Sequence, residues 1–494
     1  MDTTSLALRL GRFHGINRRL VEQNRYSFDK IIFGFPIFIL IQLVMKIYIK
    51  RLNTKALIEK MTSWPIQIHW VFPLKFGEVK RLANHVWDKL IVFFGSVLGF
   101  LIVQYLIVHP LKMSIYLLLS VVVAFTLAYL LRSGTFEKKL IPLALLVSLA
   151  AFSTGYILQT KAFLAREDSR PIPVLTRDKG DPGDGHIAVI YFTHGEPETY
   201  DPIGWINQFN EFDQQGIDFI PLFARPFFAY QLRNAYLRVG SSHHRQMHFQ
   251  MLQSLEEAYR QEGDETTRFY ISFLDDNPRP DAAVIQALND GASHIIVSEL
   301  FLTISNHTAE GEELIHEINV NEYGATLHFT GPMYDSETLR SMFIQRAADH
   351  IGDTDPSKVG VLLVGHGQPD EWDREWPTET EQEIGFREAV LKDFEEAGYL
   401  PENLSLAWMS FKEPKPAPKV EEFVANGVEK IVFFSAAISA DSIHSQYDIP
   451  ELVYEAQVPD GFPILNLGAW NDDPIVIQAI KEKIDAIIYT ELMP

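Results

Sequence analysis

The chain of 494 residues predicts an α/β fold: two doubly wound parallel-sheet units preceded by an α-helical transmembrane region. Three observations predict it. Long uncharged apolar runs fill the chain before about residue 165, short apolar runs alternate with amphipathic stretches after residue 187, and the alternating part repeats itself. Such alternation is typical of a mostly parallel sheet with helices on both faces. We therefore expect a membrane domain at 1–165, a linker at 166–186, and α/β units at 187–352 and 353–494.

The membrane domain is predicted from three runs of about 19 residues without a charge, at 90–108, 113–131 and 140–158. A helix needs roughly 20 apolar residues to cross the hydrocarbon core. A further apolar run at 31–49 is interrupted by Lys46, so it is either a short span or an interfacial helix. We expect three or four transmembrane helices. Basic segments tend to lie on the cytoplasmic side of a membrane. The basic segments at 1–27 and 50–89 can both lie there if the chain has three spans but not if it has four, so the orientation stays open.

Charge divides at the same point as hydropathy. Residues 1–165 hold 20 Lys and Arg against 7 Asp and Glu, whereas the whole chain has a net charge of −21, so the remainder is strongly acidic. An acidic domain is a poor nucleic-acid binder, because phosphate neutralisation needs Lys and Arg. Solubility explains such a charge, and attraction of cations is the alternative. With no cysteine, disulfides, thiolate metal sites and cysteine nucleophiles are excluded.

The linker at 166–186 is predicted from Pro171, Pro173 and Pro182 among Gly and Asp residues. Beyond it, short apolar runs rich in β-branched residues predict strands, and apolar residues at helical spacing predict helices. We expect strands at 187–192, 217–221, 269–273, 294–302, 326–330, 359–364, 404–409, 430–435 and 463–466. We expect helices at 244–261, 280–290, 309–318, 336–350, 383–397, 417–425 and 474–488.

An internal repeat predicts two related units. One copy runs from Asn277-Pro-Arg-Pro through a helix ending at Gly291 to an apolar strand, and the other runs from Glu413-Pro-Lys-Pro through Gly427 to its strand. Each glycine falls where a helix ends and a positive φ is needed. Each copy is preceded by a strand that ends in His-Gly, with Pro two residues later, at 194–197 and 366–369.

The repeat delivers two histidines from each half. His194 and His366 follow the first strand of a unit, and His307 and His444 follow a later strand. Ligands bind outside the carboxyl ends of the strands in open α/β sheets. Imidazole is a ligand for Fe, Co, Ni, Cu and Zn, and it can also accept a proton near neutral pH. We expect His366 and His444 to share one metal ion, and Asp441 to orient the His444 imidazole.

Two weaker signals lie between these motifs. His244 and His248 are four residues apart, so they share one helix face and could bind a metal, although we expect a solvated helix start there. Glu371, Trp372, Glu375 and Trp376 follow His366 and could edge its pocket, or form an ordinary packed loop. The sequence holds no P-loop, no dinucleotide-binding fingerprint and no serine nucleophile elbow.

Residues 187–490 resemble the class II tetrapyrrole chelatases: ferrochelatase, and the sirohydrochlorin and anaerobic cobalt chelatases. Gly195-Glu-Pro-Glu-Thr-Tyr-Asp201 is similar to the loop after ferrochelatase's first strand, and the run from 361 to 369 is similar to the strand leading into its histidine motif. The catalytic histidine of that motif carries over to His366. His444 stands where ferrochelatase has its catalytic Glu, and where the sirohydrochlorin and cobalt chelatases have a histidine followed by Asp-Leu-Pro; here Asp448-Ile-Pro450 follows. Gly311-Glu-Glu313 is similar to a cobalt-chelatase motif and suggests Glu313 as a third metal ligand.

The resemblance implies a membrane-anchored lyase that inserts a divalent metal, Fe²⁺ or else Co²⁺ or Ni²⁺, into a porphyrin or related tetrapyrrole. His366 and His444 would be catalytic, with His194 and His307 as secondary candidates. No cofactor beyond the substrate metal is expected, and the partners would be a tetrapyrrole, a divalent metal and the lipid membrane. We expect a multi-pass protein of the inner or plasma membrane; the side of the α/β part stays open, and the nature of the substrate favours the cytoplasm. The alternatives are a non-catalytic membrane haem or metal carrier on this scaffold, and a membrane scaffold that binds only protein.

Overall fold

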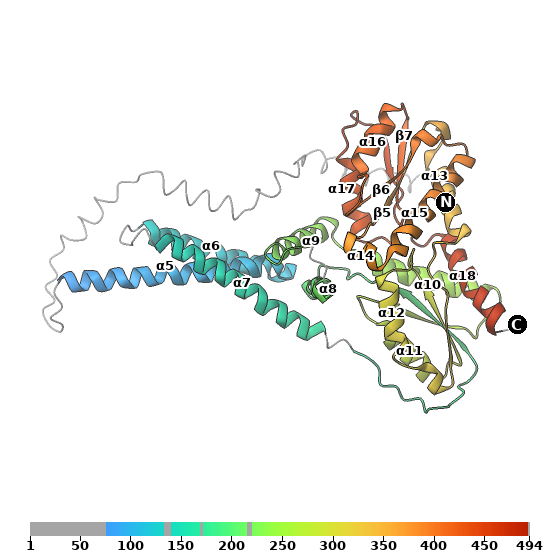
Figure 1. Cartoon of the computed structure of the whole chain (residues 1–494), viewed down its shortest axis with the longest axis horizontal. Helices are drawn as coiled ribbons and strands as arrows, with labels where there is room; N and C mark the ends of the chain where they lie inside the picture. The colour runs from blue at the N-terminus through green and yellow to red at the C-terminus, as the bar shows by residue number, and fades with distance from the viewer. Residues whose placement is uncertain (1–75, 133–139, 168–170, 215–219, 493–494) are drawn as a thin grey trace, which may run out of the picture. The chain divides into compact units, whose positions relative to one another are not determined.

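The computed structural model describes residues 76–132, 140–167, 171–214 and 220–492 (Figure 1). The run at 31–49 and most of the strand expected at 217–221 lie outside these residues. Contacts between Cα atoms divide the chain into two compact units. The first lies within residues 1–102 and 115–154, and the second comprises Val103–Ser114 and Gly155–Pro494.

Three helices dominate the N-terminal part of the described chain: α5 (Phe76–Ile107), α6 (Pro110–Arg132) and α7 (Leu140–Glu167). Each contains a stretch long and apolar enough to cross a membrane, at Val86–Ile107, Pro110–Arg132 and Leu140–Ala165. The three uncharged runs predicted as spans are thus confirmed as helices of spanning length. Large apolar side chains such as Leu111 and Tyr129 are exposed along α6, as expected for a surface that faces lipid.

Helices α5 and α7 approach each other through small residues. A Cβ added at Gly99 would lie 2.0 Å from the Ser148 carbonyl oxygen, and one added at Gly95 would lie 3.2 Å from that of Ala144. Small residues four apart let helix backbones pack closely in a membrane, where burial of apolar surface alone does not drive association. The glycines of α5 therefore set this helix contact.

The α/β region contains two parallel sheets of four strands each, which confirms the predicted fold class. The first sheet has the order β2-β1-β3-β4, and the second has the equivalent order β6-β5-β7-β8. The central strands β1 and β5 are buried along their whole length, which explains why their sequences read as unbroken apolar runs. The strands are β1 (Ile187–Thr193), β2 (Arg268–Phe273), β3 (His294–Glu299), β4 (Thr326–Phe329), β5 (Val359–Gly365), β6 (Leu404–Trp408), β7 (Lys430–Ser435) and β8 (Ile464–Asn466).

The helices that cover the sheets include all seven that the sequence predicts. These seven are α10 (His244–Gln261), α11 (Pro280–Asn289), α12 (Asn306–His316), α13 (Glu337–Ile351), α15 (Pro377–Glu396), α16 (Pro416–Ala425) and α18 (Pro474–Ile487). Four more were not predicted: α8 (Pro202–Gln214), α9 (Arg225–Val239), α14 (Asp370–Glu375) and α17 (Ile449–Tyr454). The buried residues of α9 include two arginines, and α14 and α17 have only six residues each, too few to show a helical period. Short 3-10 turns lie at Val320–Tyr323, Pro356–Lys358 and Pro401–Asn403, and π-helical turns at His444–Asp448 and Ile488–Leu492.

The internal repeat is borne out by backbone geometry. Gly291 and Gly427 end equivalent helices with φ of 93° and 86°. The loop after β2 hydrogen-bonds to the His194 carbonyl, and the loop after β6 hydrogen-bonds in the same way to the His366 carbonyl. The two copies therefore build the same turn beside the two His-Gly motifs.

The two sheets share one core because each half lends a helix to the other. Helix α13 follows β4 but packs against α15 and β7, and α18 packs against α10 and β3; in Figure 1 the red α18 lies beside the green α10. Side chains of β1 and β5 consequently belong to one apolar cluster. The unit boundary expected between residues 352 and 353 stays a prediction. Helices α13 and α18 lie on opposite sides of it in sequence, and each packs against the half on the other side.

Candidate functional site

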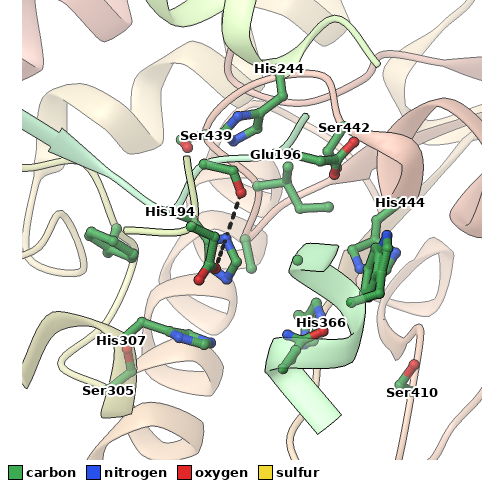
Figure 2. Close-up of a pocket in the computed structure, with 18 of the residues that line it drawn as sticks. His194, Glu196, His244, Ser305, His307, His366, Ser410, Ser439, Ser442 and His444 are labelled. Atoms are coloured by element: carbon green, nitrogen blue, oxygen red, sulfur yellow. Dashed lines mark hydrogen bonds and ion pairs between the residues drawn. The ribbon is translucent and has the colours of Figure 1, made fainter. Parts of the chain in front are cut away.

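A cavity of about 620 Å³ lies beyond the carboxyl ends of the central strands of both sheets. Ligand sites in open α/β sheets lie in this position. The four histidines predicted from the repeat all line it, and Figure 2 shows His194 and His307 on one side with His366 and His444 on the other. The fold thus gathers into one pocket histidines that are far apart in the sequence.

The His-Gly motifs fix the first histidine of each pair. Gly195 and Gly367 have φ of 94° and 78°, and a Cβ at Gly367 would lie 2.4 Å from the Ser410 carbonyl oxygen, so only glycine fits. This turn brings the glycine carbonyl back to the imidazole: Nδ1 of His194 lies 2.9 Å from the Gly195 oxygen, and Nδ1 of His366 lies 2.7 Å from the Gly367 oxygen. A carbonyl only accepts, so each Nδ1 carries the hydrogen and each Nε2 keeps its lone pair.

The second histidine of each pair begins a helix. His307 lies in the first turn of α12, which Ser305 and Thr308 cap, and His444 starts the π-helical turn His444–Asp448. The ring centroids of His194 and His307 are 4.5 Å apart, and those of His366 and His444 are 5.3 Å apart. Two imidazoles this close can reach one ion with bonds near 2 Å. The described residues contain no group of three or more His, Asp and Glu arranged to hold a metal. Each histidine pair would therefore supply two ligands to a metal ion, and the other coordination positions of the ion would be open to a bound molecule.

Glu313 is not brought to the pocket. Its side chain is exposed on α12, and it is absent from the pocket lining. Six residues along a helix correspond to about 240° of rotation, which turns Glu313 away from the face that carries His307. The structure therefore does not place the expected third ligand beside the histidines.

The carboxylate that orients His444 is Asp448, and the expectation for Asp441 is wrong. Oδ2 of Asp448 lies 2.7 Å from Nδ1 of His444, one helical turn along the chain. Asp441 instead accepts a hydrogen bond from the Ser445 hydroxyl. Residues four apart in a helix lie on one face, whereas Asp441 precedes the helix, so the spacing of four is the one that makes the contact.

The pocket imidazoles divide into neutral ones and one that holds a proton more tightly. Burial lowers the pKa of His366 to about 4, with a further contribution from His444, and burial also lowers the pKa values of His194 and His307. Burial would lower the pKa of His444 too, but the hydrogen bond and charge of Asp448 outweigh it and raise this pKa. At neutral pH His366 thus offers a free lone pair, while His444 holds its proton more tightly than an ordinary imidazole.

Glu196 is a pocket carboxylate that the sequence reasoning did not single out, although it stands inside the His194 motif. Its carboxylate accepts a hydrogen bond of 3.0 Å from the backbone N–H of Ile443, the residue before His444. Burial raises its pKa, and the Ser242 hydroxyl and His444 partly offset that effect. Glu196 therefore ties the first half of the pocket to the loop that carries His444, and it can take up a proton.

A buried ion pair supports the backbone at His366. Glu383 accepts a hydrogen bond of 3.0 Å from the His366 N–H, and its carboxylate lies 3.5 Å from the guanidinium of Arg387. Arg387 is fully buried, donates to the carbonyls at the ends of β5 and β6, and lies 4.0 Å over the Trp408 ring. One turn earlier, burial and Glu383 raise the pKa of Glu379 to about 8, so this pocket carboxyl is largely protonated at neutral pH.

His244 and His248 are buried, which corrects the expected solvated helix start. Their Nε2 atoms lie 3.3 Å apart, and His248 also contacts the hydroxyls of Tyr191 at 2.9 Å and Thr193 at 3.2 Å. Burial lowers the pKa of His248 to about 3 and lowers that of His244 strongly. The pair is therefore neutral, and only His244 reaches the pocket wall.

The rest of the pocket is largely aromatic and acidic. Helices α8 and α9 supply several of the rings, and of the four residues expected to edge the pocket after His366, only Trp372 lines it. Flat apolar walls with a few convergent polar groups are typical of sites for large organic ligands. The aromatic lining residues are Trp205, Phe209, Phe212, Phe228, Phe301, Trp372 and Phe411.

Comparison with known proteins gives likenesses in solved structures alone. No protein-family model matches the chain, and no curated protein matches it. The sirohydrochlorin chelatase SirB from Bacillus subtilis subspecies spizizenii, in complex with cobalt, is similar with a TM-score of 0.38 and 13% identity over 62% of this chain and 97% of that one. DR2241 from Deinococcus radiodurans, a multi-domain protein with structural similarity to chelatases, gives 0.39 and 13% over 60% and 54%. CbiX, the terminal enzyme of siroheme biosynthesis in denitrifying bacteria, gives 0.33 and 15% over 61% and 98%.

Proposed function

We propose that this chain is a membrane-anchored chelatase that inserts a divalent metal ion, Fe²⁺ before Co²⁺ or Ni²⁺, into a porphyrin or related tetrapyrrole. The observation that carries the proposal is the His366–His444 pair, which faces a large aromatic pocket with one imidazole kept neutral and the other hydrogen-bonded to a carboxylate. The motifs that resemble the class II tetrapyrrole chelatases fall on this same pair. The metal is a substrate of the reaction and not a resident cofactor.

His366 is the proposed ligand of the incoming metal. Its Nδ1 is held by the Gly367 carbonyl, so Nε2 is the donor atom, and its low pKa prevents protons from competing with the metal. The hydrogen bond from Nδ1 to a carbonyl is the usual means of fixing the ring and tautomer of a metal-binding histidine.

His444 and Glu196 are the proposed proton acceptors. Insertion of a divalent metal releases two protons from the pyrrole N–H groups, and both must leave the pocket. His444, with its pKa raised by Asp448, takes the first at Nε2, and Glu196, whose pKa is raised by burial, takes the second. The two groups interact electrostatically, so the carboxylate also stabilises the imidazolium formed first.

A second candidate function is a non-catalytic haem or metal carrier. Histidines reach the pocket from both halves, and imidazoles from two sides can also ligate the iron of an intact haem. This reading predicts binding of the macrocycle and the metal, but no insertion.

Insertion by the full chain in lipid nanodiscs tests the proposal. Fe²⁺ and metal-free protoporphyrin are mixed with it anaerobically, and the loss of free-porphyrin fluorescence is followed. We expect turnover that His366→Ala lowers about 100-fold or more and that His350→Ala, a change at an exposed histidine of α13, leaves intact. Binding of the porphyrin without insertion of Fe²⁺, Co²⁺ or Ni²⁺ would support the carrier instead, and failure to bind any tetrapyrrole would sink both readings.

For the location, we propose a multi-pass protein of the inner or plasma membrane with its α/β part on the cytoplasmic side. The three helices of spanning length support the membrane attachment. Because the chain lacks cysteine, a single Glu455→Cys change at an exposed position gives one site for a membrane-impermeant thiol reagent. Labelling of intact cells would contradict the cytoplasmic side.

A further inference from the structure

The pocket lining has an unusual charge composition. Six carboxylic side chains line it: Glu196, Asp201, Asp275, Asp276, Glu379 and Glu383. Glu379 is largely protonated at neutral pH, so the others supply the negative charge. Within the part of the chain that the structure describes, not one lining residue is Lys or Arg. The pocket wall therefore presents acidic groups to a ligand and no permanently basic one.

Cations beside the acidic wall are already paired with protein carboxylates, and one of them, Lys412, pairs with Asp373. Nη1 of Arg245 lies 2.6 Å from Oδ2 of Asp276 and also donates to the Asn277 carbonyl. Arg387 pairs with Glu383 at 3.5 Å and is fully buried. Neither guanidinium can turn to a ligand without leaving a pocket carboxylate unpaired, which is costly in a desolvated site.

The histidines do not replace these cations, because the Nδ1 atoms of three of them are already engaged by the protein. Nδ1 of His194 and Nδ1 of His366 each lie beside the carbonyl of the following glycine, and Nδ1 of His444 lies 2.7 Å from the carboxylate of Asp448. A carboxylate of a bound ligand would meet aromatic faces, engaged imidazoles or carboxylic side chains. An unpaired charge of this kind is destabilised both by desolvation and by like-charge repulsion.

We propose that the pocket selects tetrapyrroles with few peripheral carboxylates. Carboxylates that stay in water at the mouth of the pocket are tolerated, and each further carboxylate weakens binding. The inference rests on the proposed tetrapyrrole binding and adds to it the chemical class of the macrocycle. A ring with carboxylates on one edge can insert its apolar edge among the aromatic side chains. A ring with carboxylates on all four pyrroles has no such edge.

A series of porphyrins with one ring system and different side-chain charges tests this. Protoporphyrin dimethyl ester has no carboxylate, protoporphyrin has two, coproporphyrin four and uroporphyrin eight, and all fluoresce when metal-free. Dissociation constants are measured by fluorescence titration against the full chain in nanodiscs of neutral lipid. We expect uroporphyrin to bind about 100-fold more weakly than protoporphyrin, since like-charge contacts cost several kcal/mol, with coproporphyrin between them.

One substitution assigns the effect to the pocket wall. Asp276→Asn removes a lining carboxylate, keeps an oxygen for the Asn277 N–H, and leaves Arg245 free to meet a ligand. We expect uroporphyrin to bind about tenfold more tightly to this variant, from one charge change near 10 Å at an intermediate dielectric, and the gain for protoporphyrin, with two carboxylates, to be smaller. The matched control is Asp349→Asn, which removes the same charge at an exposed position of α13 outside the pocket lining.

The outcomes separate this inference from the proposed function. Affinity that stays level or rises from protoporphyrin to uroporphyrin overturns the inference and leaves tetrapyrrole binding standing. An equal gain in uroporphyrin affinity in Asp276→Asn and Asp349→Asn also overturns it, because the charge would then act from the whole surface. If none of the four macrocycles binds, the proposed function itself fails.

Discussion

The two α/β halves place equivalent histidines on different supports. The sheets have the same strand order, and His194 and His366 make the same bond to the following glycine carbonyl. Under His194, helix α10 packs the neutral pair His244 and His248 against the end of β1. Under His366, helix α15 packs the ion pair of Glu383 and Arg387 against the end of β5.

This difference shows that two copies of one fold can hold His194 and His366 in the same geometry and still surround them with different charges. In the second half, Glu383 binds the His366 N–H and Asp448 binds the His444 imidazole. The second half thus has carboxylates that fix both histidines, and it is the half to which we assign metal binding and proton uptake. The first half contributes Glu196, which hydrogen-bonds across the pocket to the Ile443 N–H. The residue at the equivalent position of the second half is Gln368, and its side-chain amide donates to Asp373 and to the Trp376 carbonyl instead.

The largest expected effect comes from breaking the ion pair of the second half. Arg387→Leu leaves Glu383 buried without its partner, and we expect the free energy of unfolding to fall by about 3–5 kcal/mol. Chemical denaturation of the full chain in detergent, followed by tryptophan fluorescence, measures it. Because removal of both charges leaves no buried charge without a partner, Glu383→Gln with Arg387→Leu should regain most of the loss. A single variant as stable as the parent would show that the pair does not support this half.

The next effect compares the two histidines directly. We expect His366→Ala to lower the rate of metal insertion about 100-fold or more, in the range found for residues that act on the reacting groups. His194→Ala should cost about tenfold or less. Rates are measured at pH 7.5 on variants whose thermal unfolding matches the parent. Equal losses would mean that the two halves share the reaction and that the assignment to the second half is wrong.

The neutral pair of the first half predicts a pH-dependent stability. The pKa of buried His248 is about 3, whereas the unfolded side chain titrates near 6.5, so the unfolded state binds more protons between these values. Stability is therefore complete above pH 6.5 and is lost as the pH falls. We expect a loss of about 2 kcal/mol from His248 between pH 6.5 and pH 5, at about 1.4 kcal/mol per unit once the unfolded histidine is protonated.

The variant His248→Gln keeps a partner for the Tyr191 hydroxyl and removes the titrating group. Unfolding free energies of parent and variant are compared at pH 7.5 and pH 5. The variant should lose about 2 kcal/mol less than the parent over this interval. If His248→Gln loses as much stability as the parent over this interval, His248 is not the source of the acid sensitivity.

The smallest expected effect distinguishes the carboxylates beside the two pairs. Asp448 raises the pKa of His444 against the opposing effect of burial, so Asp448→Asn lowers that pKa. An imidazole accepts a proton only when it is unprotonated, so the rate rises with pH through its pKa, and in the variant this rise moves to lower pH. On the plateau at pH 7.5 we expect a rate about tenfold below the parent, because the His444 imidazole is then a weaker base and has lost the carboxylate that orients it.

The matched change in the first half is Asp275→Asn, since Oδ2 of Asp275 lies 3.1 Å from Nδ1 of His194. This variant should leave the midpoint of the pH–rate profile in place. A midpoint that shifts in Asp275→Asn but not in Asp448→Asn would assign the proton acceptor to the first half.

The sequence by itself determined the fold class, the strands and most helices, the three helices of spanning length, and the histidines at the strand ends. These features depend on patterns within about twenty residues, such as uncharged runs, apolar periodicity and the His-Gly turn. The repeat could also be read, because each copy encodes the same local turns. Helix α9 was missed because its buried face includes Arg225 and Arg233, and α14 and α17 were missed because six residues are too few to show a helical period.

Only the tertiary structure decided which side chains meet in the pocket. Glu196 reaches the backbone of Ile443 across 247 residues, and no local pattern records that contact. The burial of His248 and the exposure of Glu313 likewise follow from how whole helices pack, since a polar residue in an amphipathic sequence can face either way. Electrostatic setting is thus a property of the packed molecule: the two His-Gly motifs are nearly the same in sequence, and the residues that make them differ come from other elements.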